Sequence, residues 1–293
     1  MSHGNPSSMV SPMVSPMISP MISPLDPNLV PTPHNHRRLI IIGDIHGMLT
    51  ALDALLRHVA YDPHTDHIVA VGDVVYRGPD SPGVVDRLMA LNASAVRGNH
   101  EDQVLLAWSA ARHQYRQQHG PDASLTPCPS VELDSRKSAH LDLARSLGPH
   151  RLDWLARLPL ILDARPLPIY IVHAGLVPGV ALDKQDPEAV NTMRSLVYSD
   201  SHPPVAHPLH HHSAEPWSLA WNRWQHQLPQ SQRRTVVYGH DAKRGFSQGT
   251  YTFGLDSGCV RGHPLTAMIV RATDHGAFTH TIASVPCPLP PNA

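Results

Sequence analysis

The chain has 293 residues, of which 41% are hydrophobic and only 5% aromatic, so it can bury a sizeable core made mostly of Leu, Val, Ile and Ala. Its formal net charge of −1 argues against DNA or an anionic membrane as a partner, so any phosphate would have to be bound by local arginines or a metal. The three cysteines, at 128, 259 and 287, lie far apart, which predicts neither a disulfide framework nor a zinc knuckle and favours a reducing compartment.

Residues 1–36 form a low-complexity segment in which Ser-Pro-Met-Val/Ile recurs at 11–14, 15–18 and 19–22. This density of proline excludes a helix, a secretory core and a membrane span, so we expect a disordered tail. Its Ser-Pro sites suit a proline-directed kinase as a partner. We expect one domain at 37–280, a Pro-rich tail at 281–293, and a cytoplasmic location with vacuolar delivery as the alternative.

An apolar run at 39–42 ends abruptly in Gly43-Asp44-Ile45-His46-Gly47. A short apolar run bounded by glycine predicts a buried strand that is central in a covered sheet. A carboxylate and an imidazole two residues apart at its end form a ligand pair suited to zinc, manganese or iron.

Helix and strand patterns then alternate along the first half of the chain. The 3.6-residue period predicts a helix at 48–60, and Pro82 in a first turn supports another at 81–91. Apolar runs predict strands at 67–71 and 93–96. The resulting β-α-β-α-β order is typical of a layered α/β domain, in which ligands gather at the carboxyl ends of strands.

The second half continues with further alternating segments. We expect helices at 101–118, 137–147, 151–158 and 187–198, and strands at 160–163, 169–173, 235–238, 253–260 and 265–272. The His- and Pro-rich stretch at 202–216, which contains His210-His211-His212, predicts a solvated surface loop. Trp217, Trp221 and Trp224 share one helical face, for which core packing is the expected role and base stacking the alternative.

Polar residues follow these strands with glycine close by, which leaves their side chains free to point away from the sheet. A purely structural role is hard to reconcile with five strand ends of this kind, which favours a functional site. The residues are Asp44, His46, Asp73, Asn99, His100, His173 and His240.

The ordered series Gly43–Gly47, Gly72–Ser81, Arg97–Glu101, Val172–Gly175 and Gly239–Asp241 resembles the calcineurin-like metallophosphoesterases, and within them the phosphoprotein-phosphatase superfamily. The resemblance implies an α/β fold in which a β-sandwich is flanked by helices, with a two-metal site at the strand ends. It also implies hydrolysis by in-line attack of a hydroxide shared by two divalent cations, which could be Mn, Zn, Fe or Co.

If the family's roles are transferred motif by motif, the resemblance implies that Asp44 and His46 would hold the first metal and that Asp73 would bridge both metals. Asn99, His173 and His240 would complete the second site. His100 would be the general acid and Arg77 would clamp the phosphoryl oxygens.

One position departs from the protein-phosphatase pattern. Those enzymes usually have Asp where this chain has Tyr76, and that Asp keeps the catalytic histidine a competent acid. A phenol cannot supply the missing charge, so the leaving group should need less protonation. Phosphate leaving from a phosphoanhydride, with a second pKa of about 6, meets this condition, whereas a serine alkoxide does not.

The segments Val237–Gly245 and Gly254–Val260 resemble the diadenosine-tetraphosphate-hydrolase-like and endopolyphosphatase branch. We therefore expect a phosphohydrolase of inorganic polyphosphate or dinucleoside polyphosphates. Arg194, Arg223 and Lys243-Arg244 are candidate contacts for the phosphates. The alternatives are a Ser/Thr protein phosphatase and a catalytically silent fold that serves as a protein-binding scaffold.

Overall fold

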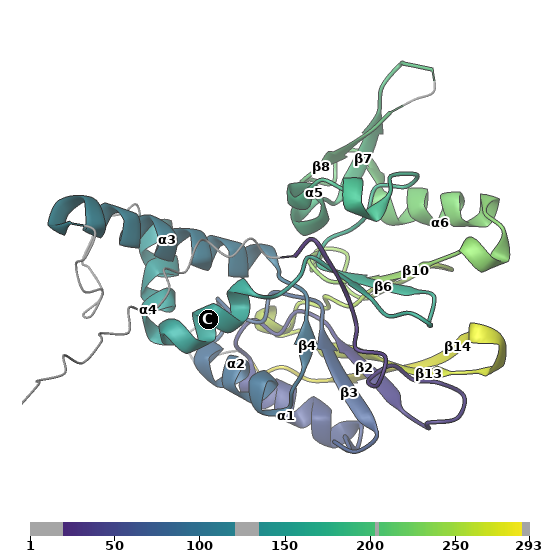
Figure 1. The fold of residues 1–293 in the computed structure, drawn as a ribbon, viewed down its shortest axis with the longest axis horizontal. Helices are drawn as coiled ribbons and strands as arrows, with labels where there is room; N and C mark the ends of the chain where they lie inside the picture. Colours follow the sequence, from purple (N-terminus) through teal and green to yellow (C-terminus); the bar gives the residue numbers. More distant parts are fainter. Residues whose placement is uncertain (1–19, 121–134, 203–204, 289–293) are drawn as a thin grey trace, which may run out of the picture.

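Two stacked sheets form the centre of the molecule, as a computed structural model of residues 20–120, 135–202 and 205–288 shows (Figure 1). One sheet has the strand order β14-β13-β2-β3-β4, and the other has the order β1-β5-β6-β10-β12-β11. Helices α1 and α2 cover the outer face of the first sheet, and α6 lies over the second (Figure 1). The predicted β-sandwich flanked by helices is therefore confirmed.

The strands have the following bounds: β1 Ile22–Pro24, β2 Arg38–Ile42, β3 Asp66–Ala70, β4 Ser94–Ala95, β5 Ile161–Asp163, β6 Ile169–Val172, β7 Ser195–Tyr198, β8 Ala206–Leu209, β9 Glu215–Pro216, β10 Thr235–Tyr238, β11 Ser247–Gln248, β12 Thr252–Gly254, β13 Leu265–Ala272 and β14 Phe278–Val285. The helices are α1 Leu49–His58, α2 Ser81–Ala90, α3 Asn99–His119, α4 Ser135–Ala156, α5 Pro187–Thr192 and α6 Trp217–Gln227, with short 3₁₀ turns at Leu182–Lys184, Gln230–Gln232, Cys259–Arg261 and Asp274–Gly276.

Strand β2 is buried on both faces, as its uninterrupted apolar run predicts. It lies between β13 and β3 and is fully buried from Leu39 to Ile42. Leu39 and Ile41 pack into the core between the two sheets, whereas Ile40 and Ile42 pack against the helices. Since burying one such side chain contributes roughly 1.5–3 kcal/mol, this strand anchors both cores.

The predicted helices of the first half are present within a residue or two of their expected bounds. In α1 the side chains of Ala51, Leu52, Leu55 and Leu56 are buried, which gives the 3.6-residue stripe. The two stretches expected at 137–147 and 151–158 both belong to α4, which is interrupted at Gly148 by a non-helical φ of 70°. No helix in the described parts of the chain is long and apolar enough to cross a membrane.

A third, small sheet of order β8-β7-β9 occupies two segments for which the sequence predicted a helix and a loop. The helix expected at 187–198 ends at Thr192, and Ser195–Tyr198 forms β7, because its Leu-Val-Tyr run pairs with antiparallel partners on both sides. The segment 202–216, expected as a loop, supplies those partners as β8 and β9. Trp217 and Trp221 of α6 are buried in the core, so their predicted packing role is confirmed.

Both ends of the domain differ from the expected boundaries. Residues 20–36 belong to the folded unit, because β1 pairs with β5 and the side chains of Leu25 and Val30 are buried. At the other end, β14 extends the sheet to Val285. The first two Ser-Pro-Met repeats, and the chain from 289 onward, lie outside the described residues.

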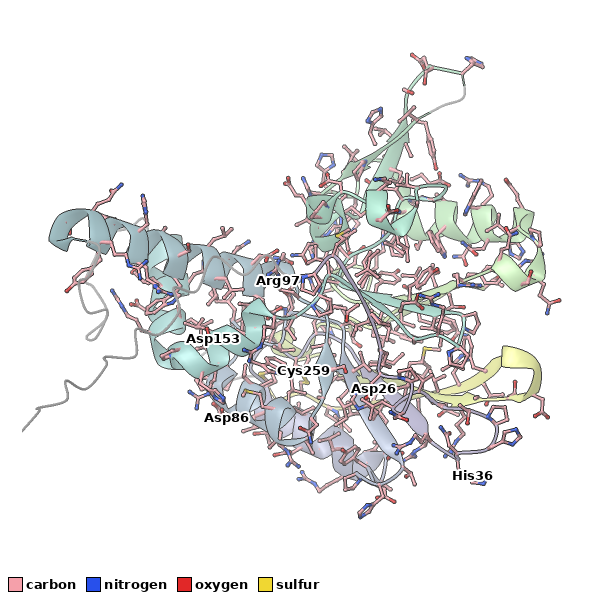
Figure 2. All side chains as sticks on the ribbon, viewed as in Figure 1. Asp26, His36, Asp86, Arg97, Asp153 and Cys259 are labelled. Atoms are coloured by element: carbon pink, nitrogen blue, oxygen red, sulfur yellow. A yellow bond between two sulfur atoms is a disulfide. The ribbon has the colours of Figure 1, made fainter. Side chains whose placement is uncertain are left out.

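Cys259 and Cys287 form a disulfide across a sequence separation of 28 residues, which corrects the expectation drawn from their spacing (Figure 2). The antiparallel pairing of β13 with β14 brings the two cysteines together, since Leu265 lies opposite Val285. A sequence separation of this size says nothing about proximity until the hairpin is known. The inference of a reducing compartment therefore loses its support from the cysteines.

Prediction for folding. His67 is buried on β3, its Nε2 lies 2.9 Å from Ser94 Oγ, and burial, with a smaller effect of Arg37, lowers its pKa to about 4. The folded state therefore disfavours protonation of His67. The contribution of the neutral His67 side chain to the free energy of unfolding is fully present above the unfolded pKa of about 6.5, and it is lost as the pH falls toward 4. In urea unfolding, the free energy of unfolding of the wild type should fall between pH 7 and pH 4. About 3 kcal/mol of that fall should be absent in His67→Gln.

The exposed histidine His64 offers the matched control, because His64→Gln makes the same substitution at a position that is not buried. A His67→Gln profile that follows the wild-type pH dependence would contradict the assignment.

Candidate active site

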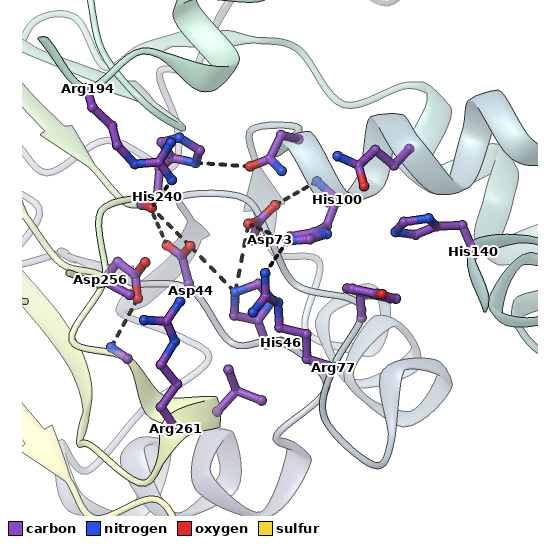
Figure 3. A pocket seen from close by; sticks show the side chains of 16 residues that line it. Asp44, His46, Asp73, Arg77, His100, His140, Arg194, His240, Asp256 and Arg261 are labelled. Carbon is purple, nitrogen blue, oxygen red and sulfur yellow. Dashed lines mark hydrogen bonds and ion pairs between the residues drawn. The ribbon is translucent and has the colours of Figure 1, made fainter. Parts of the chain in front are cut away.

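Six of the seven predicted strand-end residues line one cleft of about 510 Å³ (Figure 3). Strands β2, β3 and β4 run parallel in one sheet, and β6, β10 and β12 run parallel in the other, so each set delivers its carboxyl ends to one rim. The seventh residue, His173, is completely buried and contacts the cleft residues from beneath. The cleft residues among the seven are Asp44, His46, Asp73, Asn99, His100 and His240.

The backbone is held in an uncommon conformation where three of these residues occur. His46, Asp73 and His240 have φ values of 49°, 48° and 69°, in the left-handed region that non-glycine residues rarely adopt. Such conformations persist where the surroundings hold them in place, and they concentrate at functional sites. Gly239 allows a close approach as well, because a Cβ there would lie 2.0 Å from Asp44 Oδ1.

Three histidines are oriented by backbone carbonyl groups. His173 Nδ1 lies 2.9 Å from Val71 O, His240 Nε2 lies 3.0 Å from Thr192 O, and His46 Nδ1 lies 3.3 Å from Val75 O. In each ring, donation to the carbonyl from one nitrogen leaves the other as an acceptor directed into the site. This arrangement is characteristic of histidines that bind metals.

The free ring nitrogens surround the carboxylate of Asp73. Its Oδ2 lies 3.5 Å from His173 Nε2, 3.8 Å from His46 Nε2 and 3.9 Å from His100 Nε2. These separations are long for hydrogen bonds. They leave Asp73 common to two donor groups that could each hold a cation, one with His46 and His100 and one with His173 and His240.

Asn99 joins the second of these groups, because its Oδ1 lies 3.0 Å from both His173 Nε2 and His240 Nδ1. Asp44 lies beside the first, with its Oδ2 3.9 Å from His46 Nε2. Oxygen and imidazole donors of this kind suit divalent cations such as zinc or manganese. The residues therefore fit the metal chemistry that the sequence predicts.

Buried carboxylates dominate the electrostatics of the cleft. Burial raises the pKa of Asp44 well above its usual value, and the charges of Asp256 and Asp73 raise it further. Burial would also raise the pKa of Asp73, but the neighbouring His173, His100 and His46 lower it well below its usual value. Carboxylates packed this closely favour a bound cation as their counter-charge.

Asp256 is a cleft residue that the sequence prediction missed. It follows β12, is 4% exposed, and accepts a hydrogen bond from the Gly258 amide at 3.0 Å. Burial raises its pKa. The signal was present in Gly254-Leu-Asp-Ser-Gly, which repeats the pattern of an apolar strand followed by Asp and Gly.

Glu101 was also missed, and it supports the backbone of the site from below. Its fully buried carboxylate accepts hydrogen bonds from the amides of Asp73, Gly98 and Val75 at 2.8, 2.8 and 3.1 Å. Burial, followed by the charge of Asp73, raises its pKa to about 7. Glu101 thus fixes the turn that presents Asp73 next to the start of α3.

An aromatic column occupies the side of the cleft around His100. Tyr76 stacks on His100 with a centroid distance of 4.8 Å, and His140 of α4 stacks on Tyr76 at 4.4 Å. The buried Nδ1 of His100 finds no hydrogen-bond partner among the described residues. Burial lowers the pKa of His100 to about 4, against the opposing effect of Asp73.

Three arginines line the cleft, from three different segments. Arg77 Nη2 lies 3.5 Å from His100 Nε2, and Arg194 donates to the carbonyls of His210 at 2.8 Å and His240 at 3.3 Å. Arg261, which the sequence prediction did not name, extends toward Asp44 and Asp256 from the turn after β12 (Figure 3). These guanidinium groups give the carboxylate-rich cleft cationic walls.

Arg223 does not join them, which corrects its predicted place. It lies on α6 and forms a two-pronged ion pair with Glu215 of β9, so its charge is already paired outside the cleft. Lys243 and Arg244 are exposed, and Arg244 is paired with Asp241 at 2.9 Å. Sequence spacing alone could not distinguish these arginines from Arg194, because β9 was not anticipated.

The chain is similar to known proteins in both sequence and fold. The family model described as calcineurin-like phosphoesterase matches residues 37–244. A zinc-dependent endopolyphosphatase of Saccharomyces cerevisiae is 25% identical over 279 residues, which cover 86% of this chain and 82% of the yeast protein. A symmetrical bis(5'-nucleosyl)-tetraphosphatase of Coxiella burnetii is 26% identical over 295 residues, which cover 86% of this chain and 92% of that protein.

A solved crystal structure, described as a candidate diadenosine tetraphosphatase, is similar to this chain in both sequence and fold. It is 31% identical, with a TM-score of 0.64, and the match covers 91% of this chain and 98% of that one.

Prediction for the site. Gly239→Ala should displace Asp44, because the new Cβ would lie 2.0 Å from its Oδ1. Gly245→Ala is the control on the same segment, because its Cβ meets nothing within 4 Å, while its positive φ of 68° makes it the more strained backbone position of the two. We expect Gly239→Ala to lose bound metal, measured by elemental analysis, while its far-ultraviolet circular dichroism stays unchanged. Equal metal content in the two variants would contradict this account of the cleft.

Proposed function

The chain belongs to the calcineurin-like phosphoesterase family, and from that premise we propose that it is a two-metal phosphohydrolase that cleaves phosphoanhydride bonds. The proposed substrates are inorganic polyphosphate and dinucleoside polyphosphates. The similarity to an endopolyphosphatase and to a tetraphosphatase, each over 86% of this chain, supports this substrate class.

The observation that carries the proposal is the environment of His100. In place of a carboxylate, the ring of Tyr76 lies against the imidazole, and Nδ1 is buried without a hydrogen-bond partner in the described structure. A histidine with no carboxylate on Nδ1 has less stabilisation of its protonated form, and the Asp73 carboxylate near Nε2 does not offset the burial of the ring, so His100 is a poor proton donor for a reluctant leaving group.

Leaving-group chemistry then selects the substrate. Expulsion of a serine alkoxide needs a proton in the transition state, which this His100 would supply weakly. A terminal phosphate, with a second pKa of about 6, leaves from a phosphoanhydride without that help. The site is therefore better suited to a P–O–P bond than to a phosphoserine ester.

The proposed first cation would be held by Asp44, His46 and Asp73, and the second by Asp73, Asn99, His173 and His240. When bound, the two cations would supply Lewis-acid activation of water and neutralise charge on the phosphoryl group. Their identity as zinc, manganese, iron or cobalt is left open by the donor atoms, although one similar protein is zinc-dependent.

The chain's own cations position the substrate. Arg77, beside His100, and Arg194, held by two carbonyl groups, present guanidinium donors to the non-bridging oxygens of the phosphoryl group. Arg261 would take the phosphate on the far side of the cut bond. A charged anchor on each side of the P–O–P unit favours an extended phosphate chain.

The role of the Ser-Pro segment as a target of a proline-directed kinase stays a prediction. The Ser-Pro repeats at 11–12 and 15–16 lie outside the described residues, and Ser23-Pro24 belongs to β1, where it pairs with β5. A site within a paired strand is a poor kinase substrate, so any modification would fall on the earlier repeats.

A side-by-side assay separates the candidate activities. Phosphate release is measured from long polyphosphate, diadenosine tetraphosphate and a phosphoserine peptide with Zn, Mn and Co, and Asp73→Asn serves as the inactive control. We expect kcat/KM for the two phosphoanhydrides to exceed that for the peptide by about a hundredfold or more. A preference for the peptide would favour a protein phosphatase. No phosphate release from any of the three substrates, with any of the metals, would favour a scaffold.

Prediction for the acid. Tyr76→Asp should place a carboxylate beside His100 and raise its competence as a proton donor. We expect phosphoserine-peptide hydrolysis to rise by about tenfold or more, with little gain on polyphosphate, because only the ester needs the proton. Tyr76→Phe keeps the stacked ring without adding charge and should leave the peptide rate low. Equal gains on both substrates would contradict the leaving-group argument.

Prediction for the arginines. Arg261→Gln should raise KM for long polyphosphate by about tenfold, the loss expected for one charge-assisted hydrogen bond to phosphate. Arg223→Gln removes the same charge from a residue that is paired with Glu215 outside the cleft, so its KM should stay within twofold of wild type. The assignment of Arg261 fails if the two substitutions have the same effect.

A further inference from the structure

A basic pocket, separate from the active-site cleft, lies at the rim of the six-stranded sheet that is opposite the cleft. It encloses about 890 Å³, more than the active-site cleft, and is lined by the turn before β6, the approach to β10, the approach to β12 and the turn between β13 and β14. In Figure 1 the β13–β14 turn lies at the right-hand edge, on the side away from α3 and α4.

The pocket and the cleft are joined by the same three parallel strands. Strands β6, β10 and β12 begin beside the pocket, which is lined by Pro168 just before β6, by Thr235 at the start of β10 and by Tyr251 just before β12. The same strands end beside the cleft, near His173, His240 and Asp256. From Thr235 to His240 the chain makes five steps of about 3.3 Å, so the two sites lie roughly 17 Å apart.

The charge of the pocket is one-sided. Its lining includes Arg165, Arg233 and Arg234, and among the described side chains that line it none is acidic or a histidine. Arg165 is offset by Asp163, whose Oδ2 lies 2.7 Å from its Nε. The other two arginines contact only neutral acceptors within the described residues, so their positive charge is uncompensated.

The two uncompensated arginines are fixed in place and still have donors to offer. Arg233 bonds to the carbonyls of Leu228 and His226 and to the Tyr251 hydroxyl, and Nη1 of Arg234 donates to the carbonyls of Ser231 and Arg233. A guanidinium carries five N–H donors. Three are used in Arg233 and two in Arg234, which leaves five donors in the pair for an anion.

We propose that this pocket binds a segment of a long phosphate chain whose other end occupies the active-site cleft. Fixed guanidinium groups are suited to phosphate oxygens. A nucleotide base is disfavoured as the occupant, because the Tyr251 ring already packs against Arg233 and His226.

The identity of the chain as polyphosphate rests on the proposed function, whereas the anion site does not. A substrate held at two places about 17 Å apart gains affinity through effective concentration, but only if it is long enough to reach both. Inorganic tripolyphosphate is too short to span that distance, so it should engage the cleft alone during turnover.

Steady-state kinetics of the full metal-loaded chain test this. Arg234→Gln and Arg234→Glu should raise KM for long-chain inorganic polyphosphate by about fivefold and by more than fivefold respectively, with kcat unchanged and KM for tripolyphosphate within twofold of wild type. Arg116→Glu makes the same charge change on the exposed surface of α3 and is the control. A melting-temperature comparison verifies that all variants fold.

Equilibrium binding of long-chain polyphosphate to chelator-treated protein separates this proposal from the proposed function. If the wild type hydrolyses no phosphoanhydride but Arg234→Glu still weakens polyphosphate binding, the proposed anion site is supported and the proposed phosphohydrolase function is contradicted. If hydrolysis is present but Arg234→Glu and Arg116→Glu behave alike, the pocket proposal is overturned. Loss of diadenosine tetraphosphate affinity with unchanged polyphosphate affinity would assign the pocket to a nucleotide and would also overturn it.

Discussion

The structure depends on four carboxylates, those of Asp44, Asp73, Glu101 and Asp256, being buried together at the rim where two sheets meet. Buried negative charges disfavour folding unless amides, imidazoles or cations compensate them. Glu101 is compensated by three backbone amides, and Asp73 by three surrounding imidazoles. This demand for a counter-charge suits the rim to divalent cations, as the proposed function requires.

Neither sheet builds this rim alone. The His240 amide of one sheet donates to the Asp44 carboxylate of the other at 3.2 Å, and His173 contacts the Val71 carbonyl in the same way. The small β8-β7-β9 sheet then adds the third side, since Arg194 lies at the entry to β7 and is held partly by the carbonyl of His210. In the proposed function the sandwich would therefore supply the metal ligands, while the loops and the small sheet around it would supply the contacts to the substrate.

The sequence was sufficient for the features that depend on local pattern, and insufficient for those that depend on pairing. Asp44, His46 and Asp73 could be predicted because each follows an apolar strand, and parallel strands share a rim. The ordering of residues 22–30, the placement of Arg223 against Glu215 and the bond between Cys259 and Cys287 all require knowledge of which distant segments meet. Asp256 stands between these cases, because its pattern was visible but its strand was one of several candidates.

The disulfide gives the last part of the chain a property that hydrogen bonds alone could not. Residues 259–287 form a covalently closed ring that contains β13, β14 and the exposed turn at Asp274–Gly276. A protease that cut this turn would produce two polypeptides still joined through sulfur. The nicked molecule would keep β14 tied to the sandwich, and the damage would become visible by electrophoresis only after a reductant was added.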